Sequence, residues 1–135
     1  HVHMGTMGWV ALTICASIYY VIPKIYGVEL HSVKLANVHF WLALVGQLVY
    51  SITMWITGIR QGWMWKATDA DGKLLYSFMD GLVGNYPYWH LRTLGGLIFG
   101  VGMGVFVYNI LRTIQTGRAL ERRATPAPAA SASAA

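Results

Sequence analysis

The chain is poor in charged residues. Only 11% of its 135 residues are Asp, Glu, Lys or Arg, whereas 56% are hydrophobic. Charged residues make up about a quarter of an ordinary soluble domain, so this composition excludes that class. The chain has instead three apolar stretches, and about 20 apolar residues in a helix cross the core of a bilayer. They predict an all-α integral membrane helical bundle with three transmembrane helices, over about residues 2–22, 33–59 and 88–113.

Two other features are scarce or missing. Cys15 is the only cysteine, so no disulfide can form within the chain. No basic segment precedes the first apolar stretch, so we do not expect that stretch to be a cleaved signal peptide.

The formal net charge is +5, but the basic residues are scattered over loops and the C-terminal region instead of forming a patch. We therefore expect membrane lipid as a partner, and no nucleic acid.

The distribution of Lys and Arg predicts an orientation. These residues are denser in the loop between the first two spans and after the third span than in the long loop 60–87, where three aspartates offset them. Because cytoplasmic loops carry the excess of basic residues, the first loop and the C-terminus are predicted to be cytoplasmic. The predicted organisation is a transmembrane region 1–117, with 60–87 as an external loop containing a short Asp-Gly hairpin, and a disordered cytoplasmic tail 118–135.

Polar side chains form a stripe on each of the first two spans. Such stripes face protein, because polar groups that face lipid cost free energy. They are compatible with interhelical hydrogen bonds or with a proton or water path, and we favour the hydrogen bonds. On an ideal helix, the stripe of the first span falls within a narrow arc and contains Thr6, Thr13, Ser17 and Tyr20. The stripe of the second span does the same and contains His39, Tyr50, Thr53 and Thr57.

Glycines recur every four residues in the third span, at Gly96, Gly100 and Gly104. Small residues at this spacing let two helix backbones approach closely in lipid. The pattern predicts a packing surface against another helix.

The chain opens with two histidines, His1 and His3, separated by Val2. On a regular helix, residues i and i+2 project about 200° apart and lie about 3 Å apart along the axis, so this pair cannot chelate one metal. It can ligate two centres on opposite sides of one helix, and neutral imidazole is a common ligand of haem iron. If His1 is a true terminus, its amine and the nearby nitrogens instead suit a copper or nickel site.

Several separate blocks of sequence resemble one family. They are "HVHMGTMGWVA", "IPKIYG", "HSVKLANVHFWLALVG", "MWITGIRQGWMW", "LLYSF" and "RTLGGLIFGVGM". These blocks are similar to subunit I of C-type (cbb-type) haem–copper cytochrome c oxidases. The resemblance runs from His1 to about Thr113 and corresponds to the last three of that subunit's twelve helices. Because the chain lacks a start Met and begins within a span, we expect it to be a piece of a longer protein.

The resemblance implies a function and a ligand set. The family is a proton-pumping terminal oxidase that takes electrons from cytochrome c and reduces oxygen to water at a high-spin haem–copper centre. Carried over to this sequence, His1 is the catalytic residue that ligates the high-spin haem b as its proximal ligand, and His3 is an axial ligand of the low-spin haem b. The copper ligands are expected in the part of the subunit that this chain lacks.

The resemblance also implies the surroundings of the chain. The expected partners are the remainder of subunit I, the c-type cytochrome subunits with their c-type haems, and cytochrome c as electron donor. The expected location is the bacterial inner membrane. Two alternatives stay open: a small three-span assembly or structural protein with an N-terminal histidine copper site, and a related nitric oxide reductase.

Overall fold

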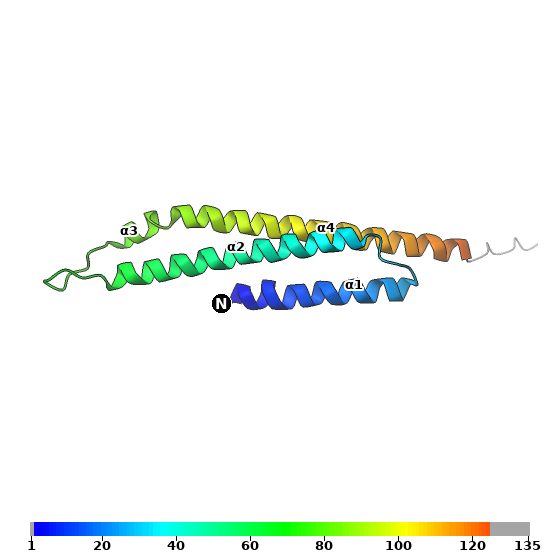
Figure 1. Cartoon of the computed structure of the whole chain (residues 1–135), viewed down its shortest axis with the longest axis horizontal. Helices are drawn as coiled ribbons and strands as arrows, with labels where there is room; N and C mark the ends of the chain where they lie inside the picture. Colours follow the sequence, from blue (N-terminus) through cyan, green and yellow to red (C-terminus); the bar gives the residue numbers. More distant parts are fainter. Residues whose placement is uncertain (1, 125–135) are drawn as a thin grey trace, which may run out of the picture.

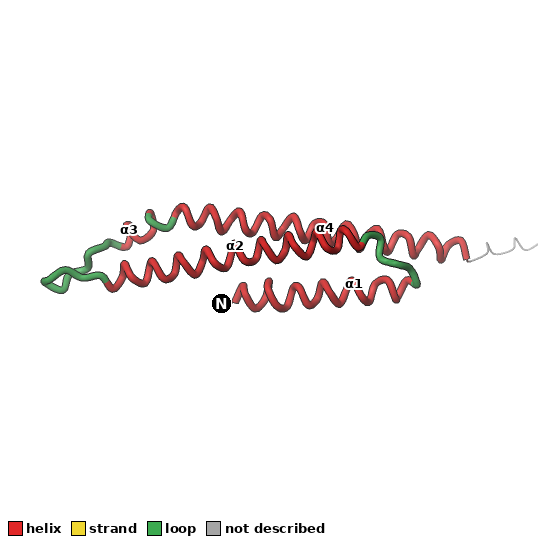
Figure 2. The backbone as a smooth tube through the Cα atoms, in the orientation of Figure 1, coloured by secondary structure: helices red, strands yellow, loops and turns green. Residues whose placement is uncertain are grey.

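The computed structural model describes residues 2–124, and nearly all of them are helical (Figure 2). Its elements are the π-helix η1 (Met4–Ala11), α1 (Leu12–Tyr26), α2 (Val33–Lys66), α3 (Phe78–Val83) and α4 (Tyr86–Ala124). Helices η1 and α1 form one continuous rod that lies alongside α2 and α4 (Figure 1). Three helical stretches in this part of the chain are long and apolar enough to cross a membrane, which confirms the predicted all-α bundle of three spans.

The rod continues past the predicted end near residue 22 and ends at Tyr26, before Gly27. Gly27 takes a positive φ of 60°, a conformation that favours glycine, and the N–H of Gly27 bonds back to the carbonyl of Lys24. After a short connection, the Ser32 side chain accepts a hydrogen bond of 3.2 Å from the Leu35 N–H. This N-cap starts α2 at Val33.

The other two spanning helices are also longer than predicted. Helix α2 continues to Lys66 instead of ending near residue 59, so the start of the predicted loop 60–87 is helical. Helix α4 runs from Tyr86 to Ala124, so residues 118–124, predicted as disordered tail, are also helical. Hydropathy marks only the stretch that crosses lipid, whereas Arg, Leu, Ala and Glu continue a helix into water without a breaking proline. Residues 125–135 of the predicted tail lie outside the described residues.

The rest of the loop contains the predicted hairpin. An isolated antiparallel bridge joins Thr68 to Leu74. Between them, Gly72 takes a φ of 76°, and a carboxylate oxygen of Asp69 accepts hydrogen bonds from the N–H groups of Asp71 and Lys73 at 3.0 and 2.8 Å. The Asp-Gly signal is therefore confirmed as a tight turn.

Helices α2 and α4 pack backbone to backbone at two glycines. A Cβ on Gly46 would lie 2.5 Å from the Phe99 nitrogen, and one on Gly95 would lie 2.7 Å from the Tyr50 nitrogen. Only glycine fits at such distances. The glycines predicted to make a close contact are different ones: the space around Gly96, Gly100 and Gly104 is open among the described residues. Their face does not meet α2, so their packing against a helix outside this chain stays a prediction.

The connection between α1 and α2 is anchored by α4. The Asn109 side chain accepts a hydrogen bond from the Ser32 N–H at 3.0 Å and donates one to the Ser32 carbonyl at 2.8 Å. The Thr113 hydroxyl oxygen accepts a hydrogen bond of 3.0 Å from the His31 N–H. Asn109 and Thr113 are both fully buried. The turn thus obtains its polar partners from the last span of the chain.

A small apolar cluster lies between the rod and α4. Cys15 contributes from α1, and Phe106 and Ile110 contribute from α4. Partly buried side chains surround these three: Ile18, Tyr19, Ile22, Leu30, Met103 and Ile114. The cluster holds α1 against the cytoplasmic half of α4, as defined by the predicted orientation.

The two polar stripes behave differently. On α2, His39, Thr53 and Thr57 are buried, so the stripe faces protein as predicted. Nδ1 of His39 lies 3.3 Å from the Tyr19 hydroxyl, while Nε2 is buried without a hydrogen-bond partner among the described residues.

The stripe on the rod is exposed among residues 2–124, so its contact with protein stays a prediction. The hydroxyls of Thr6, Thr13 and Ser17 donate to carbonyls four residues earlier in their own helix. A hydroxyl satisfied in this way needs no partner on another helix, which is why the stripe can remain uncovered here.

Candidate functional site

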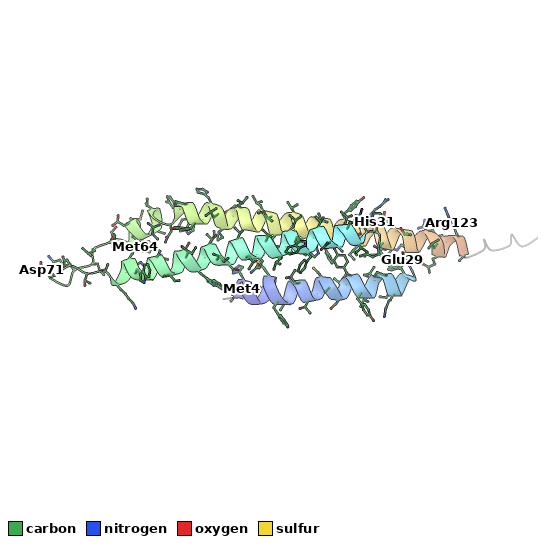
Figure 3. The ribbon with its side chains drawn as sticks, viewed as in Figure 1. Met4, Glu29, His31, Met64, Asp71 and Arg123 are labelled. Carbon is green, nitrogen blue, oxygen red and sulfur yellow. The ribbon has the colours of Figure 1, made fainter. Side chains whose placement is uncertain are left out.

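The fold places His3 against the middle of α2. His3 is helical and directly precedes η1, and its ring lies 5.3 Å from the Tyr50 ring between centroids, with the planes tilted by 41°. Met4, the next residue, marks this end of the rod beside α2 in Figure 3. Tyr50 is about 25 Å along α2 from its first residue, at 1.5 Å per residue. The His3 side chain is exposed within this chain.

The backbone next to His3 is a π-helix. Helix η1 covers Met4–Ala11, and its sequence MGTMGWVA includes two glycines, Gly5 and Gly8. π-Helical turns are rare and occur frequently at functional sites. The predicted angle between His1 and His3 assumes a regular helix. His1 lies outside the described residues, so the relative direction of the two rings stays a prediction.

A cleft of about 210 Å³, here called the His3 cleft, opens beside the ring. It is lined by residues of the rod, α2 and α4: His3, Met4, Tyr50, Ser51, Met54, Trp55 and Arg92. Arg92 Nη1 lies 4.0 Å from the sulfur of Met54. The cleft therefore combines an imidazole, a cation and apolar side chains.

A larger and more apolar hollow of about 690 Å³, here called the Trp9 hollow, adjoins the cleft. The two share Met4 and Trp55, and the rest of the hollow is lined by Val2, Gly5, Thr6, Trp9 and Val10. A Cβ on Gly5 would meet nothing within 4 Å, so there is free space at this turn. Histidine is one of the axial ligands that haem iron takes. Apolar walls suit the haem macrocycle, and a cation suits its carboxylates. The residues present fit such a group.

Gln47 connects α2 to the start of the rod. Its side-chain Nε2 lies 3.2 Å from the His3 carbonyl oxygen, 3.5 Å from the Met4 sulfur and 3.0 Å from the Ser51 hydroxyl oxygen. Gln47 is only 3% exposed. The buried amide of Gln47 therefore forms a hydrogen bond to the backbone of His3 from the middle of an apolar span.

No group of three or more His, Cys, Asp or Glu side chains that could hold a metal ion forms among residues 2–124. The described histidines are spread along the bundle. His31 lies in the turn before α2, and His90 is exposed on α4. The ring of His39 packs against the rings of Tyr19 and Phe106. His3 is thus the described histidine that lines the His3 cleft, and Met4 and Trp55 connect this cleft to the Trp9 hollow.

Most of the chain matches a known protein family. Residues 1–98 match the family model described as "Cytochrome C and Quinol oxidase polypeptide I". The matched region begins at the paired histidines and includes the rod, α2 and the first part of α4.

The chain belongs to this oxidase polypeptide I family.

Curated relatives agree with this assignment. The chain is 45% identical over 122 residues to the "Cbb3-type cytochrome c oxidase subunit CcoN1" of Stutzerimonas stutzeri, an alignment that covers 90% of this chain and 26% of the relative. It is 44% identical over 115 residues to a "Cytochrome c oxidase subunit 1 homolog" of Agrobacterium tumefaciens, covering 84% of this chain and 21% of the relative. The chain thus spans about a quarter of the length of these oxidase subunits.

A more distant relative is named for a different reaction. A nitric oxide reductase subunit of Stutzerimonas stutzeri is 25% identical over 133 residues, covering 96% of this chain and 27% of the relative. The lower identity agrees with the resemblance of the loop to the oxidases. Membership in the oxidase family sets aside the alternative of an unrelated three-span assembly protein.

Two side chains of the site have no signal in the sequence analysis. Arg92 is not among the predicted site residues, although it lines the His3 cleft from α4. Gln47 is not among the predicted site residues, although a polar residue in the middle of an apolar span marks a functional candidate. Its hydrogen bond to His3 joins residues 44 apart in sequence, which no local pattern reveals.

Proposed function

We propose that this chain is part of the catalytic subunit of a cbb-type terminal oxidase, which takes electrons from cytochrome c and reduces oxygen to water while pumping protons. One observation carries the proposal: within a family of oxidase subunits, the exposed His3 lines a cleft that contains the cation Arg92 and adjoins an apolar hollow. The chain corresponds to the last three helices of a twelve-helix subunit, and it acts only within the full complex.

His3 is proposed as an axial ligand of the low-spin haem b, and His1 as the proximal ligand of the high-spin haem b. The role of His3 is supported by the open space at its ring and by the neighbouring apolar walls of Trp9 and Trp55. His1 lies outside the described residues, so its role is supported by the family assignment alone.

The residues around His3 orient its imidazole ring and place a charge beside it. A neutral imidazole presents one lone pair to iron, and Tyr50 packs against the ring, which limits how the imidazole can turn. The Arg92 guanidinium places a positive charge in the His3 cleft, where it favours a carboxylate. When bound, the two b-type haems would carry electrons onward and, with copper held elsewhere in the subunit, reduce oxygen.

The proposed location is the bacterial inner membrane, with the C-terminus in the cytoplasm. The turn with Glu29 and His31 lies at the same end of the bundle as Arg123, and Asp71 lies at the opposite end (Figure 3). The two basic regions of the sequence thus share one end, as the positive-inside rule requires. His3, about 25 Å along α2 from that end, is then nearer the outer face.

The proposed partners are the rest of subunit I, c-type cytochrome subunits with their haems, cytochrome c and lipid. Large apolar side chains on the outside of the helices support the first and last of these. Trp9, Val33 and Leu97, one from each span, are between 63% and 75% exposed in this chain. Apolar area of this extent in a membrane helix is covered by lipid or by neighbouring helices.

The test is spectroscopic and uses the complete oxidase. In reduced-minus-oxidised spectra, His3→Ala is expected to lose the low-spin haem b signal, because a six-coordinate haem needs both axial ligands. His1→Ala is expected to perturb the high-spin centre and abolish oxygen reduction. His90→Ala, which alters an exposed histidine away from the site, serves as the control and should retain both signals. Retention of the low-spin signal in His3→Ala would refute the assignment.

Nitric oxide reduction is the second candidate, supported by the similarity to a nitric oxide reductase. The two functions differ in the gas that the purified complex consumes with a reduced electron donor. We expect rapid oxygen consumption, with nitric oxide consumption slower or absent. The reverse result would favour the second candidate.

A further inference from the structure

Gln47 is a buried amide at an unusual place. It lies in the middle of α2 and is 3% exposed, and its neighbours in the sequence are mostly apolar or small. Burying an amide costs free energy unless it forms hydrogen bonds. Its contacts therefore indicate what the residue does.

The direction of the main contact follows from chemistry. The His3 carbonyl can only accept a hydrogen bond, so the amide must present Nε2 and not Oε1 to it, at 3.2 Å. Ser51 fixes the same nitrogen from the next turn of α2, at 3.0 Å. Nε2 has two protons, which suffice for these two oxygen acceptors; the Met4 sulfur at 3.5 Å is a weaker third acceptor.

The contact falls where the backbone of the rod is irregular. His3 directly precedes η1, the π-helical segment in which hydrogen bonds shift from i+4 to i+5. A donor from another helix at this carbonyl fixes the position of the backbone just where the register changes. The His3 ring packs against Tyr50, which lies one turn from Gln47 on the same helix.

We propose that Gln47 is a positioning residue for the haem ligand at His3: its amide holds the His3 carbonyl, and Tyr50 holds the ring. The orientation of the imidazole relative to the iron then depends on α2. This inference rests on the proposed function, because it takes His3 to be an axial ligand. Groups one step behind a metal-ligating histidine orient it and tune the metal.

Simple interhelical packing is the competing explanation, and one detail weighs against it. Oε1 of Gln47 is buried and has no hydrogen-bond partner among residues 2–124. An apolar side chain of the same size would join the helices without leaving a buried acceptor unsatisfied. Helix packing alone does not require an amide here, and what the amide provides is the hydrogen bond to His3.

The test uses Gln47→Met in the complete oxidase, because methionine keeps the volume and removes the donor. We expect the low-spin haem b to remain bound, with a shifted midpoint potential in a redox titration and altered g-values in its electron paramagnetic resonance spectrum. Thr57→Val is the matched control: it removes another buried polar group from α2, one whose hydroxyl donates within its own helix. This control should leave the potential and the g-values unchanged.

Ser51→Ala provides a second, milder variant if Gln47→Met does not assemble. It removes one partner of the amide and should give a smaller shift of the same sign. Wild-type potential and g-values in Gln47→Met, or in Ser51→Ala where only that variant assembles, would overturn the inference. Equal shifts in Thr57→Val would do the same. Failure of the proposed function is separate: it is the retention of low-spin haem in His3→Ala.

Discussion

The two halves of this bundle are packed in opposite ways. Helices α2 and α4 meet backbone to backbone at Gly46 and Gly95, and about a third of their span windows is buried within the chain. In the rod of η1 and α1, which carries His3, only 6% of the span window is buried. The α2–α4 pair is thus a scaffold whose two helices are tightly packed against each other. The rod, with the proposed ligand His3 at its start, is held at a few points, namely Gln47, the Cys15 cluster and Tyr19.

This difference suggests a division of labour. The tightly packed α2–α4 pair holds its side chains in place. The rod is attached at few points, which leaves its other faces free for cofactors and neighbouring helices. The comparison predicts that changes in the scaffold reduce stability strongly, whereas changes at the attachments of the rod act more locally.

The largest effect is expected from Gly46→Ala. The added methyl group would lie 2.5 Å from a backbone nitrogen of α4, so the helices must separate. Overpacking of this kind costs about 3 kcal/mol or more. We expect little assembled oxidase, measured as haem content of the membranes. Gly81→Ala is the control, because a Cβ at this buried glycine meets its nearest neighbour at 3.8 Å. Equal loss in both variants would contradict the rigid scaffold.

An intermediate effect is expected from Asn109→Ala. It removes both hydrogen bonds to Ser32 and leaves the N–H and carbonyl groups of that residue without these partners. The expected cost is about 2–3 kcal/mol, which should lower the temperature at which the purified oxidase unfolds. The exposed neighbour Gln115→Ala should leave that temperature unchanged.

The smallest effect is expected from Tyr19→Phe. It removes the hydroxyl that lies 3.3 Å from His39, one of the attachments of the rod, and keeps the aromatic packing on Phe106. A single neutral hydrogen bond contributes about 1 kcal/mol. Thermal unfolding of Tyr19→Phe should therefore differ little from wild type, with the exposed Tyr20→Phe as its comparison. A loss greater than that of Asn109→Ala would reverse the proposed ranking of the two regions.

The sequence predicts much of the fold, because crossing a bilayer requires an apolar helix of known length. It predicts the helix ends less well, since the polar extensions up to Lys66 and Ala124 follow helix propensity and not hydropathy. Glycine spacing indicates candidate faces, but the contact of Gly46 with Gly95 depends on how two helices meet.

The site divides in a similar way. His3 is identified by its resemblance to a family, and the structure adds its open surroundings. Gln47 and Arg92 become part of the site only when α2 and α4 lie beside the rod. Such contacts between distant residues are a property of the folded chain and have no local signature.

The anchoring of the first turn by α4 has a consequence for synthesis. The partners of Ser32 and His31 are 77 and 82 residues further along the chain. At about 5–20 residues per second, a ribosome needs about 4–16 s to make that interval. During this time the turn lacks the Asn109 and Thr113 side chains that complete its hydrogen bonds. The first two spans therefore enter the membrane as an unfinished hairpin, and the arrival of the third span fixes their connection.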